Sequence, residues 1–375
     1  MNILALEPYY GGSHRAFLDG WIRRSRHDWT VQSLPPNKWK WRMRHAAVTF
    51  AWQIDAAVHD GAAWDALICS DMLNLAEFLG LAPASVARLP RVAYFHENQI
   101  TYPVQFAKDF DYHFGFTNMS TGLAADESWF NSAYHRDSFL EGLADFLKRM
   151  PDHQPLAAVD RIRASSRIYY PGVDPVAAAT PARQEICTIL WAARWEFDKG
   201  PEQFFEAISA LARDGYNFRL NIIGGDERSA LPIFEKMHDA FADRIDHWGY
   251  QPTRDDYVHV LAASDVVVST ARHEFFGIGV IEAIKAGAYP LLPEDLAYPE
   301  VLSALEGDAS PFFYAHDRGD LQQALAALIE RHDGGGLWEG DPDRARRAVA
   351  RFDWDQVIEA LDDGLERVAR NASRS

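Results

Sequence analysis

The sequence predicts an α/β protein with two doubly wound parallel sheets, and three observations support this fold class. With 375 residues, the chain is longer than one ordinary hydrophobic core requires. Short β-rich runs alternate with longer amphipathic runs, as expected for parallel strands joined by crossover helices. This alternation occurs in two successive series, which indicates two similar domains.

The expected elements follow the chain in order. We expect strands at 2–6, 30–34, 66–70, 91–95, 128–131 and 167–170 in the first series, and at 188–192, 219–223, 244–248, 265–270, 289–292 and 312–314 in the second. Amphipathic runs at 201–214, 231–241 and 321–332 predict helices. The last such run, 353–370, is expected to form a helix capped by Asp353 that packs back on the first domain.

The expected domain boundary follows the first series. A Tyr-Tyr-Pro-Gly-Val-Asp motif at 169–174 ends the last strand of that series, and an Ala- and Pro-rich stretch at 175–183 follows it. Proline and glycine end strands and form linkers. We therefore expect a first domain at 1–174 and a second domain at 184–352.

The composition is that of a well-packed globular protein, with 48% hydrophobic and 24% charged residues. No run approaches the roughly 20 consecutive apolar residues of a membrane helix, and the first residues predict a strand rather than a signal peptide. Cys69 and Cys187 are far apart and lack a metal-binding spacing. We therefore expect a cytoplasmic protein without a membrane span or structural zinc.

The net charge of −17 limits the nucleic-acid partners that the chain can have. Proteins that coat nucleic acid without specificity are usually basic, because neutralisation of phosphates supplies their affinity. This chain can bind RNA only through a local basic patch. The sequence does not indicate an oligomeric state.

A Pro-Tyr-Tyr-Gly-Gly-Ser-His motif at 8–14 lies between the first expected strand and a helical run at 15–24. Gly11 and Gly12 let backbone amides approach an anion at the beginning of a helix. The motif is not Gly-x-Gly-x-x-Gly, so a dinucleotide site is not indicated. A plain strand-to-helix turn explains the residues equally well.

The motif His-Glu-Phe-Phe-Gly-Ile-Gly-Val-Ile-Glu at 273–282 follows a strand of the second series. Gly277 permits close approach of a ligand, and the helix after it offers its positive end. The carboxylates of Glu274 and Glu282 suit vicinal hydroxyls of sugars. Alternatively, Glu274 is a partner of the helix dipole and Glu282 is a solvated helix residue.

Arg194 and Lys199 follow the first strand of the second series, at the edge where open α/β sheets bind ligands. A guanidinium and an ammonium five residues apart suit a diphosphate. They can instead form ion pairs with Glu196 and Asp198.

A basic and aromatic segment, residues 38–44, alternates cations with large apolar side chains. Its cations are Lys38, Lys40, Arg42 and Arg44, and its apolar members are Trp39, Trp41 and Met43. An RNA loop needs cations for its phosphates and rings for its splayed bases. A half-buried strand with snorkelling side chains would show the same alternation.

His96 follows an expected strand and precedes the polar residues Glu97, Asn98 and Gln99. Such a group suits sugar or acceptor contacts, as does Asn118 further along the chain, although a lone histidine is more often structural.

Together these motifs resemble the retaining glycosyltransferase family 4, and the resemblance covers nearly the whole chain. It implies the GT-B fold, in which two Rossmann-like domains face a central cleft, the second of which binds the sugar nucleotide. It implies that His96, Arg194, Lys199 and Glu274 are catalytic. The implied donor contacts are Gly11, Gly12, Ser13, Gly249, Tyr250, Gln251, Phe276, Gly277, Ile278 and Glu282.

A narrower resemblance connects the first domain with the tRNA-queuosine α-mannosyltransferases. It rests on the motifs at 8–14, 39–44, 95–99 with 102–103, and 130–132 with 138–139. It implies GDP-mannose as the donor, without any other cofactor, and the queuosine of a tRNA anticodon loop as the acceptor. The implied acceptor contacts are His14, Lys38, Trp39, Lys40, Trp41, Arg42, Arg44, Glu97, Asn98, Gln99 and Asn118.

The expected mechanism uses no metal, because Asp-Phe-Asp at 109–111, which spells an Asp-x-Asp motif, lies outside a strand end. Arg194, Lys199 and helix N-termini would neutralise the leaving diphosphate. One alternative is a glycosyltransferase of the same fold with a lipid, polysaccharide or other small acceptor. A second is a non-catalytic RNA-binding protein on the same scaffold. An oxidoreductase is disfavoured by the missing dinucleotide motif.

Overall fold

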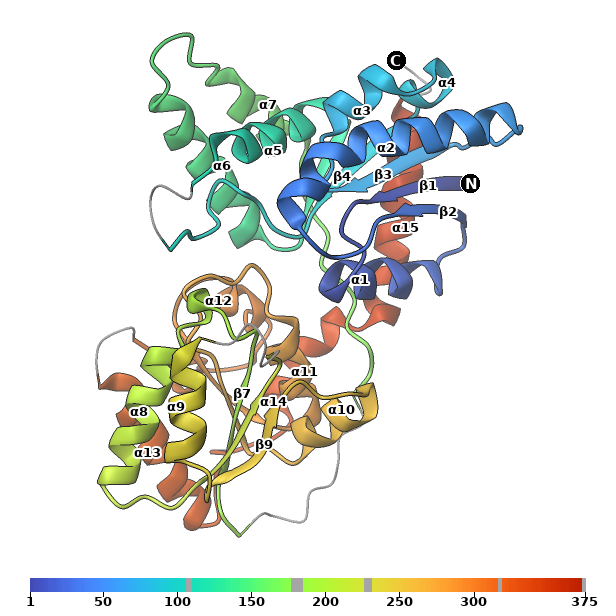
Figure 1. Ribbon diagram of the computed structural model, residues 1–375. Coiled ribbons are helices and arrows are strands. Elements are labelled where there is room, and N and C mark those ends of the chain that lie inside the picture. Colours follow the sequence, from blue (N-terminus) through green and yellow to red (C-terminus); the bar gives the residue numbers. More distant parts are fainter. Residues whose placement is uncertain (106–109, 177–184, 226–230, 316–318, 373–375) are drawn as a thin grey trace. The chain divides into compact units, whose positions relative to one another are not determined.

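The structure, a computed structural model, describes residues 1–105, 110–176, 185–225, 231–315 and 319–372. The chain divides into two compact units (Figure 1). The first unit consists of Met1–Gly172 and Trp354–Ser375, and the second of Val173–Asp353. Most of the linker expected at 175–183 lies outside the described residues.

The first unit contains a six-stranded parallel sheet in the order β2-β1-β3-β4-β5-β6. Its strands are β1 (Asn2–Glu7), β2 (Asp28–Ser33), β3 (Ala66–Ser70), β4 (Arg91–Phe95), β5 (Glu127–Phe130) and β6 (Ser166–Ile168). Its helices are α1 (Gly12–Ile22), α2 (Trp39–His59), α3 (Leu75–Leu81), α4 (Ala84–Ala87), α5 (Tyr112–Ala124), α6 (Ala133–Lys148), α7 (Ala157–Ser165) and α15 (Trp354–Ala372).

Both faces of this sheet are covered, which is why β1 is a continuous apolar run. Alternate side chains of a strand point to opposite faces. Accordingly, Leu4 packs in one core cluster with Phe50 of α2. Ile3 packs in the other with Phe17 of α1 and Leu361 of α15.

The last helix, α15, belongs to the first unit although the second unit separates it from the rest of that unit in the sequence. Asp362 on this helix is buried and accepts hydrogen bonds from Trp21 Nε1 at 2.8 Å and Ser25 Oγ at 2.8 Å. Trp354 fills the space beside Gly20, where a Cβ atom would lie 2.2 Å from the indole. The expected helix 353–370 therefore completes the core of the first unit.

The second unit contains a parallel sheet in the order β12-β11-β10-β7-β8-β9. Its strands are β7 (Thr188–Ala192), β8 (Arg219–Ile223), β9 (Ile245–Gly249), β10 (Val266–Val268), β11 (Tyr289–Pro293) and β12 (Phe313–Tyr314). Its helices are α8 (Pro201–Arg213), α9 (Pro232–Ala240), α10 (Arg254–Ala262), α11 (Ile278–Ala286), α12 (Tyr298–Val301), α13 (Asp320–Asp333) and α14 (Arg344–Val349), with short 3₁₀ turns at Phe197–Lys199, Ser310–Phe312 and Ala350–Phe352.

The predicted α/β class is confirmed, and all twelve expected strands are present within two residues of their expected bounds. The strand order reverses between β1 and β3 in the first sheet and between β7 and β10 in the second. Open α/β sheets bind ligands beyond the carboxyl ends of the strands at such reversals. Among the described residues, no helix is both long enough and apolar enough to cross a membrane.

Candidate functional site

Lys199 lies at the strand reversal of the second sheet, at the end of the 3₁₀ turn that follows β7. Its ammonium group is buried and donates hydrogen bonds to the carbonyl oxygen of His273 at 2.8 Å and to Glu274 Oε2 at 3.3 Å. Asp198 Oδ2 lies 3.3 Å away. Burial lowers the pKa of Lys199, but Glu274 and Asp198 raise it above its ordinary value, so the group stays charged.

Glu274 follows β10, the strand on the other side of the same reversal. Its Oε1 accepts hydrogen bonds from the amides of Gly277 at 3.1 Å and Phe276 at 3.4 Å. Burial raises the pKa of Glu274, but Lys199 and the Phe276 amide hold it below its ordinary value. The structure thus brings together two of the residues predicted to be catalytic, both ionised at neutral pH.

Gly277 is required by the turn that positions Glu274. It caps α11 with a φ of 87°, a conformation that side-chain-bearing residues rarely adopt. A Cβ atom there would also lie 3.1 Å from the ring of Tyr298. Ile278, a predicted donor contact, begins α11. Phe276 is buried and contacts Phe352 edge to face at a centroid distance of 5.0 Å.

Arg194 is much more exposed than Lys199, with 56% of its side chain accessible. It forms an ion pair with Glu196 Oε1 at 3.4 Å. Both ion pairs considered as the alternative for these cations, Arg194–Glu196 and Lys199–Asp198, are therefore present. Since exposed pairs contribute little free energy, Arg194 can exchange its partner for a ligand at low cost.

Glu282 is buried, so the alternative interpretation of a solvated helix residue is wrong. Its Oε1 lies 2.6 Å from Arg254 Nη2, and its Oε2 accepts a hydrogen bond from Tyr257 Oη at 2.9 Å. Sequence reasoning missed both partners, which lie on α10. A ribose contact by Glu282 stays a prediction.

The residues predicted to contact the nucleobase lie at the end of β9, an edge strand two positions from β7. Gly249 has a φ of 81° and accepts a hydrogen bond from Gln251 Nε2 at 3.2 Å. Tyr250 is 71% exposed. This exposed ring is available for stacking, whereas Gln251 already has an intramolecular partner.

In the first unit, Glu7 at the end of β1 and His14 on α1 form a buried pair. His14 Nδ1 lies 3.2 Å from Glu7 Oε2, and Ser70 Oγ donates to Glu7 Oε1 at 2.9 Å. Burial lowers the pKa of His14, but Glu7 and Asp71 raise it to about 9. His14, predicted as an acceptor contact, is thus a buried imidazolium beside a carboxylate.

His96 follows β4, and its ring lies 4.1 Å from that of His14, centroid to centroid. Burial and the neighbouring charge of His14 hold the pKa of His96 well below its ordinary range. His96 is therefore a neutral imidazole at physiological pH. Such a group can accept or donate one hydrogen bond, as a sugar hydroxyl needs.

Asp71, directly after β3, is a functional candidate that sequence reasoning missed. It is fully buried, its Oδ1 accepts from the amide of His96 at 2.9 Å, and its Oδ2 has no hydrogen-bond partner. Burial raises the pKa of Asp71 to about 8, although His14 opposes this. A charged residue directly after a buried strand was the signal that could have found it.

The predicted acceptor contacts after His96 mostly bond to each other. Asn98 is fully buried and accepts from the amide of Ile100 at 3.0 Å. Asn118 is also fully buried and accepts from the amide of Gln99 at 2.7 Å. Gln99 Nε2 donates to Glu97 Oε1 at 3.0 Å. Asn98 and Asn118 therefore position the loop, and Glu97 and Gln99 are its more accessible members.

The Gly-Gly motif forms the beginning of α1. A Cβ atom at Gly11 would lie 2.4 Å from Pro36, so packing explains this glycine without a ligand. Gly12 has a φ of 53°, and both Gly12 and Ser13 are exposed. Contacts of these residues with donor phosphates stay a prediction.

The basic and aromatic segment begins α2, so its alternating pattern does not form a strand. Lys38 precedes the helix, and Trp39 is its first residue. The helical pattern is visible further along, where Met43, Ala46, Ala47, Phe50, Ala51 and Ile54 form the buried face.

The question of a metal rests on two groups of residues. Asp109 of the Asp-x-Asp motif lies outside the described residues, and Asp111 caps α5 by accepting from the amide of His113 at 2.9 Å. Ligand atoms of Glu7, His14 and His96 lie within 4.8 Å of one another, a spacing that a metal ion could use. The Glu7–His14 contact explains this proximity without an ion.

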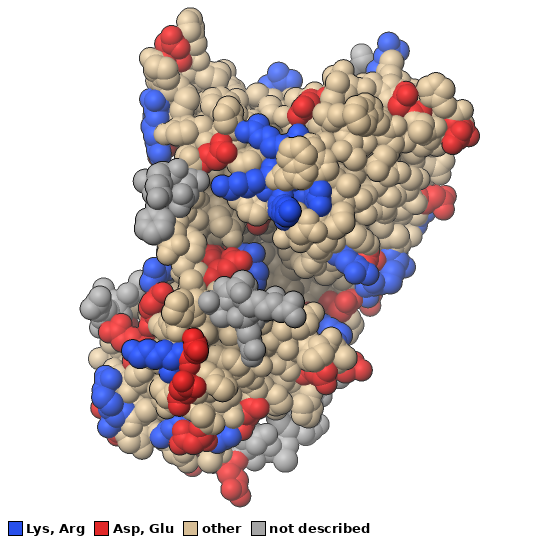
Figure 2. Space-filling model, in the orientation of Figure 1, with Lys and Arg blue, Asp and Glu red and all other residues tan. Residues whose placement is uncertain are grey.

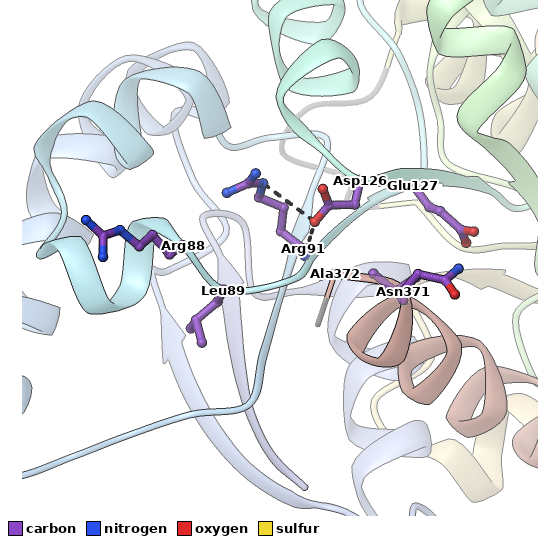
Figure 3. A pocket seen from close by; sticks show the side chains of 8 residues that line it. Arg88, Leu89, Arg91, Asp126, Glu127, Asn371 and Ala372 are labelled. Carbon is purple, nitrogen blue, oxygen red and sulfur yellow. Dashed lines mark hydrogen bonds and ion pairs between the residues drawn. The ribbon is translucent and has the colours of Figure 1, made fainter. Parts of the chain in front are cut away.

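A cavity of about 350 Å³ lies in a different part of the first unit (Figure 3). Arg91 begins β4 and Glu127 begins β5, so this cavity lies at the amino ends of the strands. An ion pair of 3.7 Å joins Arg91 to Asp126 there. Ligands of α/β sheets bind at the opposite edge, and we therefore place the candidate site at the carboxyl ends.

Comparison with known proteins identifies the family. Residues 2–173 match the model of the tRNA-queuosine alpha-mannosyltransferase N-terminal domain, and residues 178–332 match that of the glycosyl transferases group 1. A tRNA-queuosine alpha-mannosyltransferase of Drosophila melanogaster is 34% identical over 312 residues, which cover 80% of this chain and 81% of the relative. The chain belongs to the tRNA-queuosine alpha-mannosyltransferase family. It is therefore a glycosyltransferase.

More distant relatives agree with this assignment. A GDP-mannose-dependent alpha-(1-6)-phosphatidylinositol dimannoside mannosyltransferase of Mycobacterium tuberculosis is 26% identical over 54% of this chain and 52% of its own. The solved structure of sucrose-phosphate synthase from Thermosynechococcus elongatus superimposes with a TM-score of 0.72 at 14% identity, over 98% of this chain and 99% of that one. Anabaena HepE in complex with UDP gives a TM-score of 0.67 at 15% identity, over 98% and 100%. The predicted GT-B fold is thereby confirmed.

Proposed function

We propose that the protein transfers mannose from GDP-mannose to queuosine in the anticodon loop of a tRNA, with retention of configuration and without a metal. The observation that carries this proposal is the 34% identity with a tRNA-queuosine alpha-mannosyltransferase over most of both chains. The intact Lys199–Glu274 pair at the strand reversal supports catalysis rather than RNA binding alone. A tRNA substrate also fits the expected cytoplasmic location.

The second unit is proposed to hold the donor. Several relatives carry GDP-mannose in their names, which supports this sugar nucleotide. Arg194, Lys199 and the N-terminus of α11 offer positive charge to the diphosphate. Because Glu274 and Asp198 already surround the Lys199 ammonium, phosphate binding must take the place of one of these contacts.

The reaction follows from this charge arrangement. The bond from mannose C1 to the diphosphate oxygen breaks as positive charge stabilises the leaving group. The acceptor hydroxyl forms the new bond to C1 from the same face, and its proton passes to the departing phosphate oxygen. Glu274 is proposed to accept hydrogen bonds from hydroxyls of the transferred sugar. The neutral imidazole of His96 is proposed to bond another substrate hydroxyl.

A lipid-linked acceptor is the second candidate. It is favoured by relatives named for phosphatidylinositol dimannoside and cellobiosyl-diphosphopolyprenol. These relatives match about half of the chain, at 26% identity. The match of residues 2–173 to the N-terminal model of the queuosine enzymes favours the tRNA acceptor.

The test is to incubate the protein with GDP-mannose and queuosine-containing tRNA, digest the RNA, and weigh its nucleosides by mass spectrometry. We expect a queuosine heavier by one hexose, and no such product with tRNA that carries guanosine at that position. Release of GDP without modified queuosine would contradict queuosine as the acceptor and would support GDP-mannose as the donor. No product and no release of GDP would contradict both.

A further inference from the structure

The segment at the beginning of α2 has two faces with different surroundings. Trp39 packs against Phe114 at a centroid distance of 5.1 Å, in a small apolar cluster with Met43. Arg42 donates to the carbonyl oxygen of Pro35 at 3.0 Å. These residues of the segment face the protein and hold the helix in place.

The other face of the segment is open to solvent. Lys38, Lys40 and Arg44 are exposed, although the Arg44 guanidinium also lies over the ring of Phe114 at 5.0 Å, and Trp41 is 59% exposed. Figure 2 shows Lys and Arg side chains gathered on this face of the first unit, near the beginning of α2. We propose that Lys38, Lys40, Trp41 and Arg44, here called the α2 surface, bind an unpaired loop of the acceptor RNA. This inference rests on the proposed function.

Trp41 is the proposed stacking platform for a base. Its ring contacts His45 one helical turn later, at a centroid distance of 4.9 Å and an angle of 31°. His45 in turn contacts Thr49 Oγ1 at 2.8 Å and Arg42 Nη1 at 2.8 Å. The indole is therefore supported from within the helix while much of its area remains in water. Stacking on an unpaired base would remove that apolar area from water.

The charge of this surface is concentrated in a chain whose net charge is −17. From residue 38 to 54 the sequence contains four cations and no acid, and the first acid on the helix is Asp55. A polyanion gains affinity from such a cluster, while the acidic remainder of the protein repels it. This combination favours RNA bound at one place over coating of the whole surface.

Local conformation at Lys38 also departs from ordinary preferences. It has a φ of 50° and a ψ of 55°, and it is one of three non-glycine residues with positive φ among those described. Cations at the beginning of a helix are disfavoured by the helix dipole, and here no acid in the first turn offsets them. Departures of this kind concentrate at functional sites.

The inward-facing residues at the beginning of α2 pack near the edge of the first sheet where Glu7 and Asp71 lie. Trp39 and Met43 belong to one apolar cluster with Tyr9 and Met72. Tyr9 follows Glu7 by two residues, and Met72 follows Asp71 directly. The inward face of the segment therefore lies beside the sheet edge that carries Glu7 and Asp71.

The test compares Trp41→Ala and the double variant Lys40→Glu/Arg44→Glu with the wild-type protein. Direct binding of queuosine tRNA is measured at several salt concentrations, together with the KM for tRNA and the KM for GDP-mannose. We expect Trp41→Ala to raise the Kd and KM for tRNA about 10-fold. The double variant should weaken binding further. It should also lower the slope of the logarithm of the binding constant against the logarithm of the salt concentration, by about one for each cation removed. The KM for GDP-mannose should not change.

Two variants serve as matched controls. Trp52→Ala removes a tryptophan that is 74% exposed on the same helix, outside the α2 surface. Lys148→Glu reverses an exposed cation on α6. Both should bind tRNA as the wild type does. If Trp41→Ala behaves like Trp52→Ala, and the double variant binds like Lys148→Glu, the inference is overturned.

The outcomes separate this inference from the proposed function. Loss of tRNA binding in the variants of a protein that binds tRNA but transfers no mannose would support the α2 surface and contradict the function. Transfer by the wild type with unchanged tRNA binding in the variants would do the reverse. Loss of binding to anionic phosphatidylglycerol vesicles, with tRNA binding retained, would overturn the inference in favour of a membrane surface.

Discussion

The two sheets have the same number of strands and differ in where their order reverses. In each, a carboxylate contacts a cation at the reversal, Glu7 at the end of β1 with His14, and Glu274 with Lys199 on opposite sides of the second reversal. The imidazole of the first pair has a pKa of about 9, whereas the ammonium of the second stays charged throughout the physiological range. One edge geometry therefore supports a proton-sensitive site in the first unit and a permanent charge in the second.

The largest expected effect breaks the permanent charge. Lys199→Ala should lower kcat about 10²–10³-fold, because it removes the buried cation proposed to stabilise the leaving diphosphate. It also leaves the carboxylates of Asp198 and Glu274 without their buried partner. Release of GDP measures the rate, and Lys236→Ala, an exposed lysine of α9, is the matched control. If Lys199→Ala kept its turnover, the placement of the catalytic site in the second unit would be wrong.

The next effect tests the proton-sensitive pair. Burial and the charge of His14 together depress the pKa of His96, and His14→Gln removes the second cause, so this pKa should rise toward its ordinary value. The acid limb of the rate profile should then move to higher pH, with activity at pH 6 lower by up to about 4-fold, since an imidazole of pKa 6.5 is about one quarter neutral there, and a smaller loss at pH 8. His59→Gln, which alters an exposed histidine, should keep the wild-type profile. An unshifted profile for His14→Gln would show that the charge of His14 does not affect the pKa of His96.

The same variant has a consequence for stability. Because the folded-state pKa of His14 is raised from 6.5 to about 9, folded protein retains this proton while the unfolded chain releases it. The stabilisation is complete below pH 6.5 and is lost as the pH rises to about 9. The midpoint temperature of thermal unfolding should fall more steeply across this pH interval for the wild type than for His14→Gln.

A smaller effect concerns the outer part of the donor site. Glu282→Gln should raise the KM for GDP-mannose up to about 10-fold and leave kcat nearly unchanged, since a ribose contact is made equally in ground and transition states. Asp239→Asn changes an acid whose side chain is 84% exposed and provides the control. If kcat falls instead while KM is constant, Glu282 acts in the chemical step.

No effect is expected from removal of metals. Turnover after treatment with EDTA should equal that of the untreated enzyme, because cationic side chains replace the metal at the diphosphate. If turnover is lost and a divalent ion restores it, Glu7, His14 and His96 would be interpreted as a metal site, and no longer as an ion pair beside a neutral histidine. The comparison between the two units would then have to be redrawn.

The sequence predicted the strands well because both faces of each sheet are covered. A parallel strand buried on both faces, such as β3 or β8, is a short apolar run that stands out between amphipathic helices. The strand orders were not predictable, because the positions of the reversals depend on packing between distant segments. The pairing of Lys199 with Glu274, 75 residues apart, follows from that order.

The segment at the beginning of α2 shows the limit of local patterns. Alternation of cations and large rings over seven residues is compatible with a strand, and only the longer spacing from Met43 to Ile54 indicates a helix. The partners of Glu282 were missed for a different reason. Arg254 and Tyr257 reach it from α10, a contact that depends on how two helices pack.

Completion of the first unit by α15 has a consequence for synthesis on the ribosome. Trp21 bonds to Asp362, a partner 341 residues later, so the core on the α1 face of the first sheet cannot close until that helix has emerged. The second unit, Val173–Asp353, is continuous in sequence and free to fold earlier. At roughly 5–20 residues per second, elongation through that unit takes about 10–40 s. For that period the apolar face of β1 and α1 lacks its cover, and we expect nascent-chain chaperones to bind there.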